Sequence, residues 1–463
     1  MVFKLSEITV AEIVSIKGGK RLPAGKSLQS NPSNHPYIRV RDVGQRRLSM
    51  EGVEYVPDDV FPSISRYIVH ENDIVLSIVG TIGALSIVNA SYNGASLTEN
   101  CVKLTGLDYY DALYLYYYLN SGLGQQEISK GTVGAVQPKL PIYNIEKIKV
   151  LWPSEKEDRQ KIASILGGID DKIELNRRIN QTLEAMAQAL FKSWFVDFDP
   201  VKAKNAAKAE GRDPLRAAVS AISGKSDAEL DMLSPEQYKQ LAATAALFPD
   251  HLEESEFGST PSGWAIRAMP DCIDVNPSRQ LRKGSIALYL DMANVPTNSA
   301  RVQNVVAREF SSGSKFQNGD TLLARITPCL ENGKTAFVDF LSKDDVGWGS
   351  TEFIVLRPKS ELPPSFAYFL CRDPEFRAFA IAQMAGTSGR QRVPNDCFAS
   401  YKLVEPDAVI AAEFGQVAAS ALGQIKALDL EAKALASLRD TLLPKLLTGE
   451  LSVETLAKQA GIA

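Results

Sequence analysis

The sequence has few of the residues that build metal, redox and hydrolytic sites. Its 463 residues include only 5 cysteines and 3 histidines. The cysteines are scattered, odd in number and never in Cys-x-x-Cys spacing, which argues against a disulfide framework or a zinc site and fits a reducing cytoplasm. The histidines are isolated along the chain, so no Ser-His-Asp arrangement can be nominated. We expect each histidine to be an ordinary surface or packed side chain.

The sequence also lacks long apolar runs. No run approaches the roughly 20 residues that a membrane-spanning helix needs. The first residues have neither the apolar core nor the small-residue cleavage site of a secretory signal. These absences predict a cytoplasmic chain with no membrane partner. Its length predicts two or three domains, since a single core rarely grows this large.

Two partial catalytic motifs fail on their spacing. Gly333-Lys334-Thr335 resembles the end of a phosphate-binding loop, but Pro328 stands where that loop needs its leading glycine. Glu431 and Lys433 suggest a nuclease signature, yet residues two apart on a helix point to nearly opposite faces and cannot meet at one metal. No Asn/Asp-Pro-Pro-Tyr run of an amino-methyltransferase is present. The sequence therefore predicts a binding protein with no catalytic or metal-ligating residues.

Basic residues gather near the N-terminus although the formal net charge is −4. The stretch from Lys17 to Arg47 has eight basic residues and a single acid, Asp42. A basic stripe attracts a nucleic-acid backbone because binding releases counterions from the phosphates. A solvated charged loop is the alternative interpretation. Between Asp197 and Thr260 the balance reverses, with seven basic and twelve acidic residues.

One passage is written twice, 255 residues apart (386 − 131). The first copy begins GTVGAVQPK at Gly131, and the second begins GTSGRQRVP at Gly386. Each runs to a short alternating apolar segment and then to a proline that precedes a long helical pattern. Other segments match in the same order: PYIRVRDV with ALYLDMANV, ENDIVLSIV with NGDTLLARI, LTENCVKL with STEFIVLRP, and YLYYYLNS with FAYFLCRD. So long a period predicts a duplicated domain.

Each half ends in a helical pattern of about 40 residues, in which apolar residues recur in steps of three and four. Such a helix is ~60 Å long, longer than a small domain is wide. We therefore expect the two helices to pack together as an antiparallel coiled coil. Two separate amphipathic helices, each lying on its own domain, are the alternative. The predicted seam and docking residues are Ile162, Leu166, Ile169, Leu183, Leu190, Leu422, Leu435, Leu442 and Leu446.

The predicted fold is α+β, with two mixed sheet-and-helix domains joined by two long helices in a pseudo-twofold symmetric arrangement. An acidic insert rich in alanine and proline connects the first helix to the second domain. The predicted boundaries are 1–152 for the first domain, 153–196 for the central helix, 197–260 for the insert, 261–405 for the second domain, 406–448 for the C-terminal helix and 449–463 for a tail.

Four further stretches of the sequence are distinctive: KVLWPSEKEDRQKIASILGGIDDKIELNRR, FKSWFVDFDPV, AALFPDHLEESEFGSTPSGW and LRDTLLPKLLTGELSV. Through them the chain resembles the specificity subunits of Type I restriction-modification enzymes over nearly its whole length. The C-terminal stretch is the most specific of the four. One departure from the family lies in the second helix, where EFGQVAASALGQIKAL replaces the usual Gln-Ile start.

The resemblance implies that each half is a target recognition domain that reads one half of a split site on double-stranded DNA. It implies that the helices set the spacing and dock methyltransferase subunits, in two copies, for adenine methylation. A restriction and translocase subunit is a further implied partner. The chain itself would be non-catalytic and would bind no cofactor, since S-adenosylmethionine, ATP and magnesium belong to the partner subunits. An autonomous DNA-binding protein and an enzyme with an unrecognised site are the alternatives.

Base reading requires side chains with paired donors or acceptors, above all arginine for guanine and asparagine or glutamine for adenine. Phosphate contacts need only basic groups, and they position the protein without reading sequence. In the first half, the candidate DNA-binding residues are Lys20, Arg21, Arg39, Arg41, Arg46, Arg47, Gln137 and Lys139. In the second half they are Arg279, Arg282, Lys283, Arg325, Arg390, Gln391 and Arg392. Arg39 and Arg41 alternate along an expected strand, so a plain solvent-facing role is the alternative for both.

Overall fold

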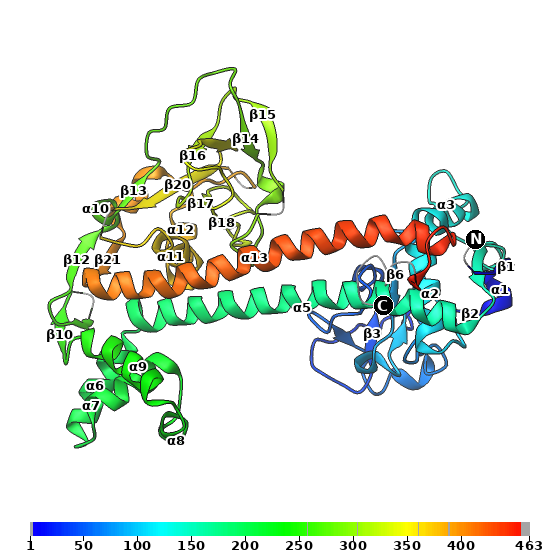
Figure 1. Ribbon diagram of the computed structural model, residues 1–463, viewed down its shortest axis with the longest axis horizontal. Coiled ribbons are helices and arrows are strands. Elements are labelled where there is room, and N and C mark those ends of the chain that lie inside the picture. The colour runs from blue at the N-terminus through cyan, green and yellow to red at the C-terminus, as the bar shows by residue number, and fades with distance from the viewer. Residues whose placement is uncertain (1–2, 257, 303, 360, 388, 455–463) are drawn as a thin grey trace. The chain divides into compact units, whose positions relative to one another are not determined.

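The computed structural model describes residues 3–256, 258–302, 304–359, 361–387 and 389–454 (Figure 1). The chain forms two compact units. Unit 1 comprises Met1–Glu174 and Ala432–Ala463, and unit 2 comprises Leu175–Glu431. Two long helices, α5 (Lys156–Phe195) and α13 (Ala408–Leu447), each contribute one segment to each unit.

Unit 1 is built on a four-stranded antiparallel sheet with the order β2-β8-β5-β6. A second sheet has the order β4-β3-β7, and β1 pairs with β9. Helix α2 is buried from Ala112 to Leu119, because it is apolar or aromatic around its whole circumference. The strands are β1 (Leu5–Thr9), β2 (Ser15–Gly18), β3 (Pro36–Ile38), β4 (Glu54–Tyr55), β5 (Ile74–Ser77), β6 (Leu85–Ile87), β7 (Ser96–Leu97), β8 (Cys101–Thr105) and β9 (Lys149–Pro153). The helices are α1 (Val10–Ile13), α2 (Tyr109–Asn120), α3 (Gly122–Gly131) and α4 (Ile142–Ile145), with the 3-10 helices η1 (Val40–Asp42), η2 (Phe61–Ser63) and η3 (Ala90–Tyr92).

Unit 2 repeats this topology. Its larger antiparallel sheet has the order β13-β20-β17-β18, its second sheet the order β15-β14-β19-β16, and β12 pairs with β21. The internal duplication is therefore present in the strand order of each unit. The strands are β10 (Leu252–Ser255), β11 (Gly258–Pro261), β12 (Ala265–Ala268), β13 (Ile273–Val275), β14 (Ile286–Leu290), β15 (Val306–Glu309), β16 (Ser314–Phe316), β17 (Thr321–Ala324), β18 (Thr335–Phe337), β19 (Gly347–Gly349), β20 (Phe353–Pro358) and β21 (Lys402–Glu405). The helices are α10 (Met269–Cys272), α11 (Phe366–Arg372) and α12 (Pro374–Ala382), with the 3-10 helices η4 (Met292–Asn294) and η5 (Asn395–Ser400).

The connecting insert folds as four short helices with a small core of their own. Ala218, Val219, Leu230 and Ala245 are buried together at its centre. Proline or a side-chain cap begins three of these helices, which explains why so polar a stretch still starts helices at defined positions. The helices are α6 (Asp199–Ala209), α7 (Pro214–Ser223), α8 (Asp227–Asp231) and α9 (Pro235–Leu247).

In unit 1, the first part of α5 packs with the last part of α13. Ile162 and Leu166 lie in the same buried cluster as Leu446. Arg439 Nη1 donates to Asp170 Oδ1 at 2.7 Å. Within this unit, residue numbers on α13 fall as those on α5 rise, so the two segments run antiparallel.

In unit 2, the remaining segments of the two helices make the same kind of contact. Asn176 Nδ2 donates to Glu431 Oε2 at 2.8 Å, and the rings of Phe191 and Phe414 lie 5.6 Å apart. These segments are therefore antiparallel too. Leu422 is buried in this unit's main cluster, and Leu183 and Leu190 pack against it.

Helix α13 departs from the expectation that no segment is apolar enough to cross a membrane. By length and composition alone it could do so, because its alanines count as apolar and its charges are widely spaced. A single helix of this kind is weak evidence for a membrane span, since a core helix of a folded domain has the same length and composition. Part of α13 is buried in the clusters of each unit, including Phe414 and Leu446.

Phe191 on α5 lies at the centre of the aromatic core of unit 2, with its ring 5.0 Å from that of Phe366. We predict that Phe191→Ala lowers the free energy of unfolding by about 3–5 kcal/mol, because it leaves a cavity that these rings cannot fill. Chemical denaturation measures the loss. The matched control is Met186→Ala on the same helix, whose side chain is 64% exposed and should change stability by less than about 0.5 kcal/mol. Equal losses in the two variants would contradict this core.

Candidate nucleic-acid interface

Each unit holds a short loop against the tip of a β-hairpin of its larger sheet. In unit 1 the loop spans Val133–Lys139 and is called the first bridged loop. Its ends pair with each other, with 2.9 Å hydrogen bonds in both directions between Val133 and Lys139. Lys139 also pairs with Val79 of the β5–β6 hairpin, and Leu140 N donates to Ile78 O at 3.0 Å. The sheet therefore fixes the base of the loop, and the tip of the loop is exposed to solvent.

The second bridged loop, Ala385–Arg392, has the same anchorage in unit 2. Ala385 pairs with Arg392, and Arg392 pairs with Ile326 of the β17–β18 hairpin. Val393 N donates to Arg325 O at 2.9 Å, as Leu140 does to Ile78 in unit 1. Lys139 of unit 1 is therefore structurally equivalent to Arg392 of unit 2, and Ile78 is equivalent to Arg325.

This match shifts the two Gly-Thr-x-Gly tetrapeptides by three residues. The equivalent glycines are Gly134, the fourth residue of its tetrapeptide, and Gly386, the first of its own. Both have positive φ angles, 98° and 129°. A Cβ atom on Gly134 would lie 2.8 Å from Gln137 O, and one on Gly386 would lie 3.1 Å from Arg390 O. Gln137 and Arg390 therefore hold the same place at the two tips.

The tips present free side chains. Val136 is 94% exposed, and Gln137 and Lys139 are exposed beside it. Arg390 is exposed at the other tip, and its guanidinium has no hydrogen bond or ion pair with any part of the chain that the structure describes. Gln391 is half-buried, with its backbone bonded to Thr327.

Arg392 differs from Arg390, because Glu352 holds it. Arg392 Nε lies 2.9 Å from both carboxylate oxygens of Glu352, and Nη2 lies 2.7 Å from Oε1. These hydrogen bonds raise the pKa of Arg392 above its ordinary value. The pair fixes the base of the second bridged loop, so Arg392 positions Arg390 and Gln391.

The basic stripe of the sequence does not form an open basic face in unit 1. Several of its arginines form ion pairs with acidic side chains from outside the stripe: Arg21 pairs with Glu99 at 2.6 Å, Arg41 with Glu54 at 3.2 Å and Arg47 with Asp171 at 3.0 Å. Counting charges along the sequence could not detect these partners. Lys20 is exposed.

Arg39 and Arg46 are largely buried, with side chains 15% and 9% exposed. Arg39 bonds Asp42 at 3.1 Å, and Arg46 donates to Gly167 O on α5 at 3.0 Å. The expected strand through Arg39 and Arg41 is wrong: β3 ends at Ile38, and Arg41 lies in the 3-10 helix η1. These contacts give Arg39 and Arg46 a packing role.

In unit 2, Arg282 and Lys283 are exposed, whereas Arg279 and Arg325 line a hollow beside the second bridged loop. Arg279 Nη2 lies 3.2 Å from the buried Asp320 Oδ1, and Arg325 Nη2 donates to Val393 O at 2.6 Å.

The long helices carry the predicted seam. Ile162, Leu166, Leu422 and Leu446 are buried, and the other predicted positions are half-buried: Ile169, Leu183, Leu190, Leu435 and Leu442. In unit 2 an apolar groove of about 910 Å³ opens between α5, α7 and α13, and Met186 and Val417 are exposed in it. Both lie among the apolar residues that recur in steps of three and four along these helices, but this pattern could not show that they stay uncovered.

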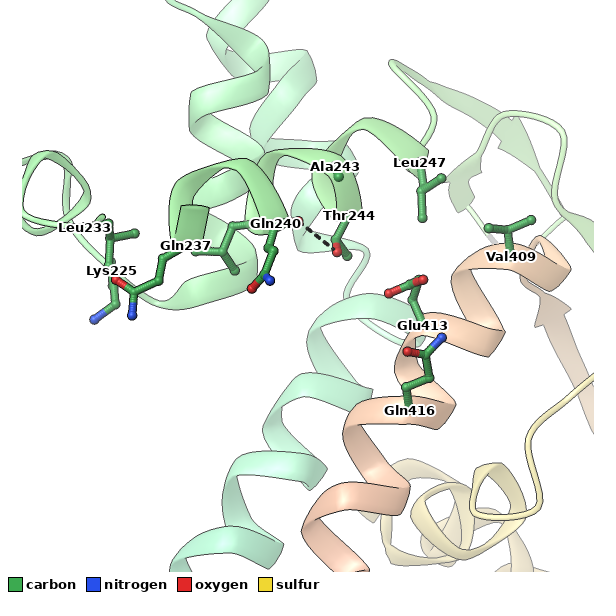
Figure 2. A pocket seen from close by; sticks show the side chains of 11 residues that line it. Lys225, Leu233, Gln237, Gln240, Ala243, Thr244, Leu247, Val409, Glu413 and Gln416 are labelled. Carbon is green, nitrogen blue, oxygen red and sulfur yellow. Dashed lines mark hydrogen bonds between the residues drawn. The ribbon is translucent and has the colours of Figure 1, made fainter. Parts of the chain in front are cut away.

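A second hollow lies between α9 and the start of α13 (Figure 2). Leu247 of α9 faces Val409 of α13 across it, and Glu413 and Gln416 line the same side as Val409. Within the described ranges, no cluster of three or more His, Cys, Asp or Glu side chains could hold a metal ion. The hollow between α9 and α13 is lined by both amide and apolar side chains, a mixture that is suited to contact with another protein.

Comparison with known proteins agrees with this architecture. Residues 3–185 match the family model described as "Type I restriction modification DNA specificity domain". The chain is 27% identical over 429 residues to the specificity subunit of the Type I restriction enzyme HindI of Haemophilus influenzae, which covers 89% of this chain and 90% of that one. These two matches support a specificity subunit of a Type I restriction-modification enzyme.

Further specificity subunits are similar to this chain over comparable lengths. The MjaIX specificity subunit of Methanocaldococcus jannaschii is 22% identical over 92% of this chain and 86% of its own. The solved S subunit of the M. genitalium Type I system has a TM-score of 0.53 at 13% identity, covering 96% of both chains. At that identity the structural match shows a shared fold alone.

The glycine at the base of each bridged loop should be hard to replace. We predict that Gly134→Ala opens the first bridged loop, because a Cβ atom would approach Gln137 O too closely and the φ of 98° is strained for alanine. Hydrogen exchange of the Val133 and Lys139 amides should become about tenfold faster, as expected for a loss of about 1–2 kcal/mol. Gly122→Ala, where a Cβ atom meets nothing within 4 Å, is the control. Unchanged exchange in Gly134→Ala would contradict the loop geometry.

Proposed function

We propose that this chain is the non-catalytic DNA sequence-specificity subunit of a cytoplasmic Type I restriction-modification complex, in which each unit reads one half of a bipartite target. The observation that supports this proposal is the repeated bridged loop. Each unit anchors such a loop on an equivalent hairpin, and the side chains at the two tips differ. One scaffold written twice, with different tips, suits two different half-sites on DNA.

The tips carry the chemistry that base reading needs. Arg390 can donate two parallel hydrogen bonds to guanine, and Gln137 can pair with adenine through one donor and one acceptor. Val136 adds an exposed apolar group that suits a thymine methyl. Exposed glycines at the loop bases let the backbone approach phosphates closely.

The long helices would set the distance between the half-sites. A helix of 40 residues extends ~60 Å, which corresponds to an upper reach of ~18 base pairs. The antiparallel contacts within each unit support packing as an antiparallel coiled coil with pseudo-twofold symmetry. The bases between the half-sites would remain unread.

The helices would also dock two methyltransferase subunits. The groove between α5, α7 and α13 supports this, because Met186 and Val417 expose apolar surface there and a partner helix could cover it. S-adenosylmethionine, ATP and magnesium would bind the partner subunits, and restriction would require a further subunit. Adenine methylation then follows from placing a methyltransferase over each half-site.

The test is a genome-wide map of methyladenine in cells that co-express this chain with the methyltransferase encoded beside it. We predict a split motif with an unread spacer, methylated on both strands. A continuous motif would contradict the two-unit reading. A soluble complex without any methylation would favour an autonomous DNA-binding protein.

Arg390→Ala and Gln137→Ala should each relax one half of the methylated motif and leave the other half unchanged. We expect a loss of about 10- to 100-fold in discrimination at one base pair, since a paired base contact contributes about 1–3 kcal/mol. Methyladenine mapping of each variant gives the readout. Arg212→Ala, an arginine of the insert that is exposed, is the control. If both variants changed the same half, the assignment of one tip to each half-site would be wrong.

Met186→Asp should weaken assembly with the methyltransferase, because a buried carboxylate would replace an apolar contact. Co-purification and size-exclusion chromatography should show at least a tenfold loss of affinity, consistent with burying an unpaired charge. Met232→Asp is the matched control, since Met232 is 86% exposed and lies outside the groove. If the two variants assembled with the methyltransferase equally well, the groove would not be part of the interface.

A further inference from the structure

Unit 2 contains a polar hollow next to the second bridged loop. Its volume is about 320 Å³, and it lies between the segment after β13, the start of β16 and the start of the β17–β18 hairpin. Most of the residues that line it are polar or basic, including Asn276, Ser278, Arg279, Lys315, Arg325 and Asn395, and Phe353 and Val355 add apolar surface.

The hollow has more positive than negative charge. Asp320 is fully buried and is shared by two guanidinium groups, Arg279 at 3.2 Å and Arg357 at 2.5 Å. Among the described residues, Lys315 Nζ donates to Arg279 O at 3.2 Å and lies 5.0 Å from the centre of the Phe310 ring, and Arg325 Nη2 donates to Val393 O. Neither of these two cations has an acidic partner among the described residues.

The other nearby acid does not neutralise this surplus. Glu352 adjoins Thr351, which lines the hollow, but both of its carboxylate oxygens are bonded by Arg392. In addition, the Nε atoms of Arg279 and Arg325 are buried and have no acceptor within the described ranges. The surplus positive charge of the lining is therefore what suits the hollow to an anionic group.

Unit 1 lacks this cluster at the equivalent positions. The strand pairing matches Lys315, opposite Trp348, with Ile68, opposite Ser96. The loop contacts match Arg325 with Ile78, as described above. In unit 1 the counterpart of Asp320 is Asp73, which a single lysine, Lys103, approaches at 3.5 Å. Both surplus cations of unit 2 are thus isoleucines in unit 1.

We propose that this hollow binds one phosphate group of the DNA backbone and gives unit 2 an anchor that unit 1 does not have. The inference rests on the proposed function, because it presumes that the second bridged loop meets DNA. Lys315 and Arg325 supply the charge, while Asn276, Ser278 and Asn395 supply neutral donors around it. Phosphate contacts position a protein without reading bases. The anchor therefore raises the affinity of the protein for DNA of any sequence, and it fixes the position of Arg390 relative to the base pairs.

The test uses the assembled complex with its methyltransferase subunits and duplex DNA that carries the mapped motif, without ATP. DNA affinity is measured by fluorescence anisotropy at a series of potassium chloride concentrations. Lys315→Ala should lower the slope of log affinity against log salt by about one, because one phosphate contact releases about 0.9 counterion. At about 0.1 M salt this corresponds to roughly eightfold weaker binding. The motif that the complex methylates should stay the same.

Lys315→Arg should restore the slope, and Lys239→Ala, at an exposed lysine on α9, should leave it at the wild-type value. An unchanged slope in Lys315→Ala would overturn the proposal, and so would an altered motif, which would indicate base reading. A nucleotide site would also leave the slope unchanged, because no ATP is present. If the wild-type complex failed to bind or methylate a split motif, the proposed function itself would fall. A wild-type complex that works beside a variant with an unchanged slope would overturn the anchor alone.

Discussion

Both cores depend on helix segments that arrive from distant parts of the chain. In unit 1 the aromatic helix α2 packs in one cluster with Ile162 and Leu166 of α5 and with Leu446 of α13. In unit 2 Phe191 and Phe414, one from each long helix, lie in one cluster with Phe366 and Phe369 of α11. The two helices are therefore part of each fold as well as a connection between them.

This dependence determines where the candidate DNA contacts can lie. The sheets are packed on the helices, so the hairpin tips and bridged loops at their edges are left to project. Rigid strands hold the base of each loop through Lys139 and Arg392, and the residues between the paired ends are free to vary. A loop that is fixed at its base can carry different side chains at its tip without a change in the fold.

The two units share a topology but differ in charge at equivalent positions. The larger sheets match strand for strand. In each of them an aspartate directly precedes the first strand of the hairpin: Asp73 precedes β5, and Asp320 precedes β17. Around that aspartate, unit 1 has Lys103 and isoleucines, whereas unit 2 has two arginines with Lys315 and Arg325 nearby. Duplication preserved the turn, because its carboxylate caps backbone amides, and left the surrounding charges free to diverge.

The sequence by itself determined the duplication and the two forty-residue helices. Each of these follows from local period and order, since an apolar stripe or an alternating strand is visible in neighbouring residues. Only the tertiary structure decided which of two Gly-Thr-x-Gly glycines are equivalent, that Arg39 and Arg46 face inward, and that Met186 and Val417 stay uncovered. Those outcomes depend on partners such as Asp171, Glu352 and α7, which lie far away in sequence. Ion pairs and packing contacts form between residues that are close in space but distant in sequence. Local sequence patterns therefore could not predict them.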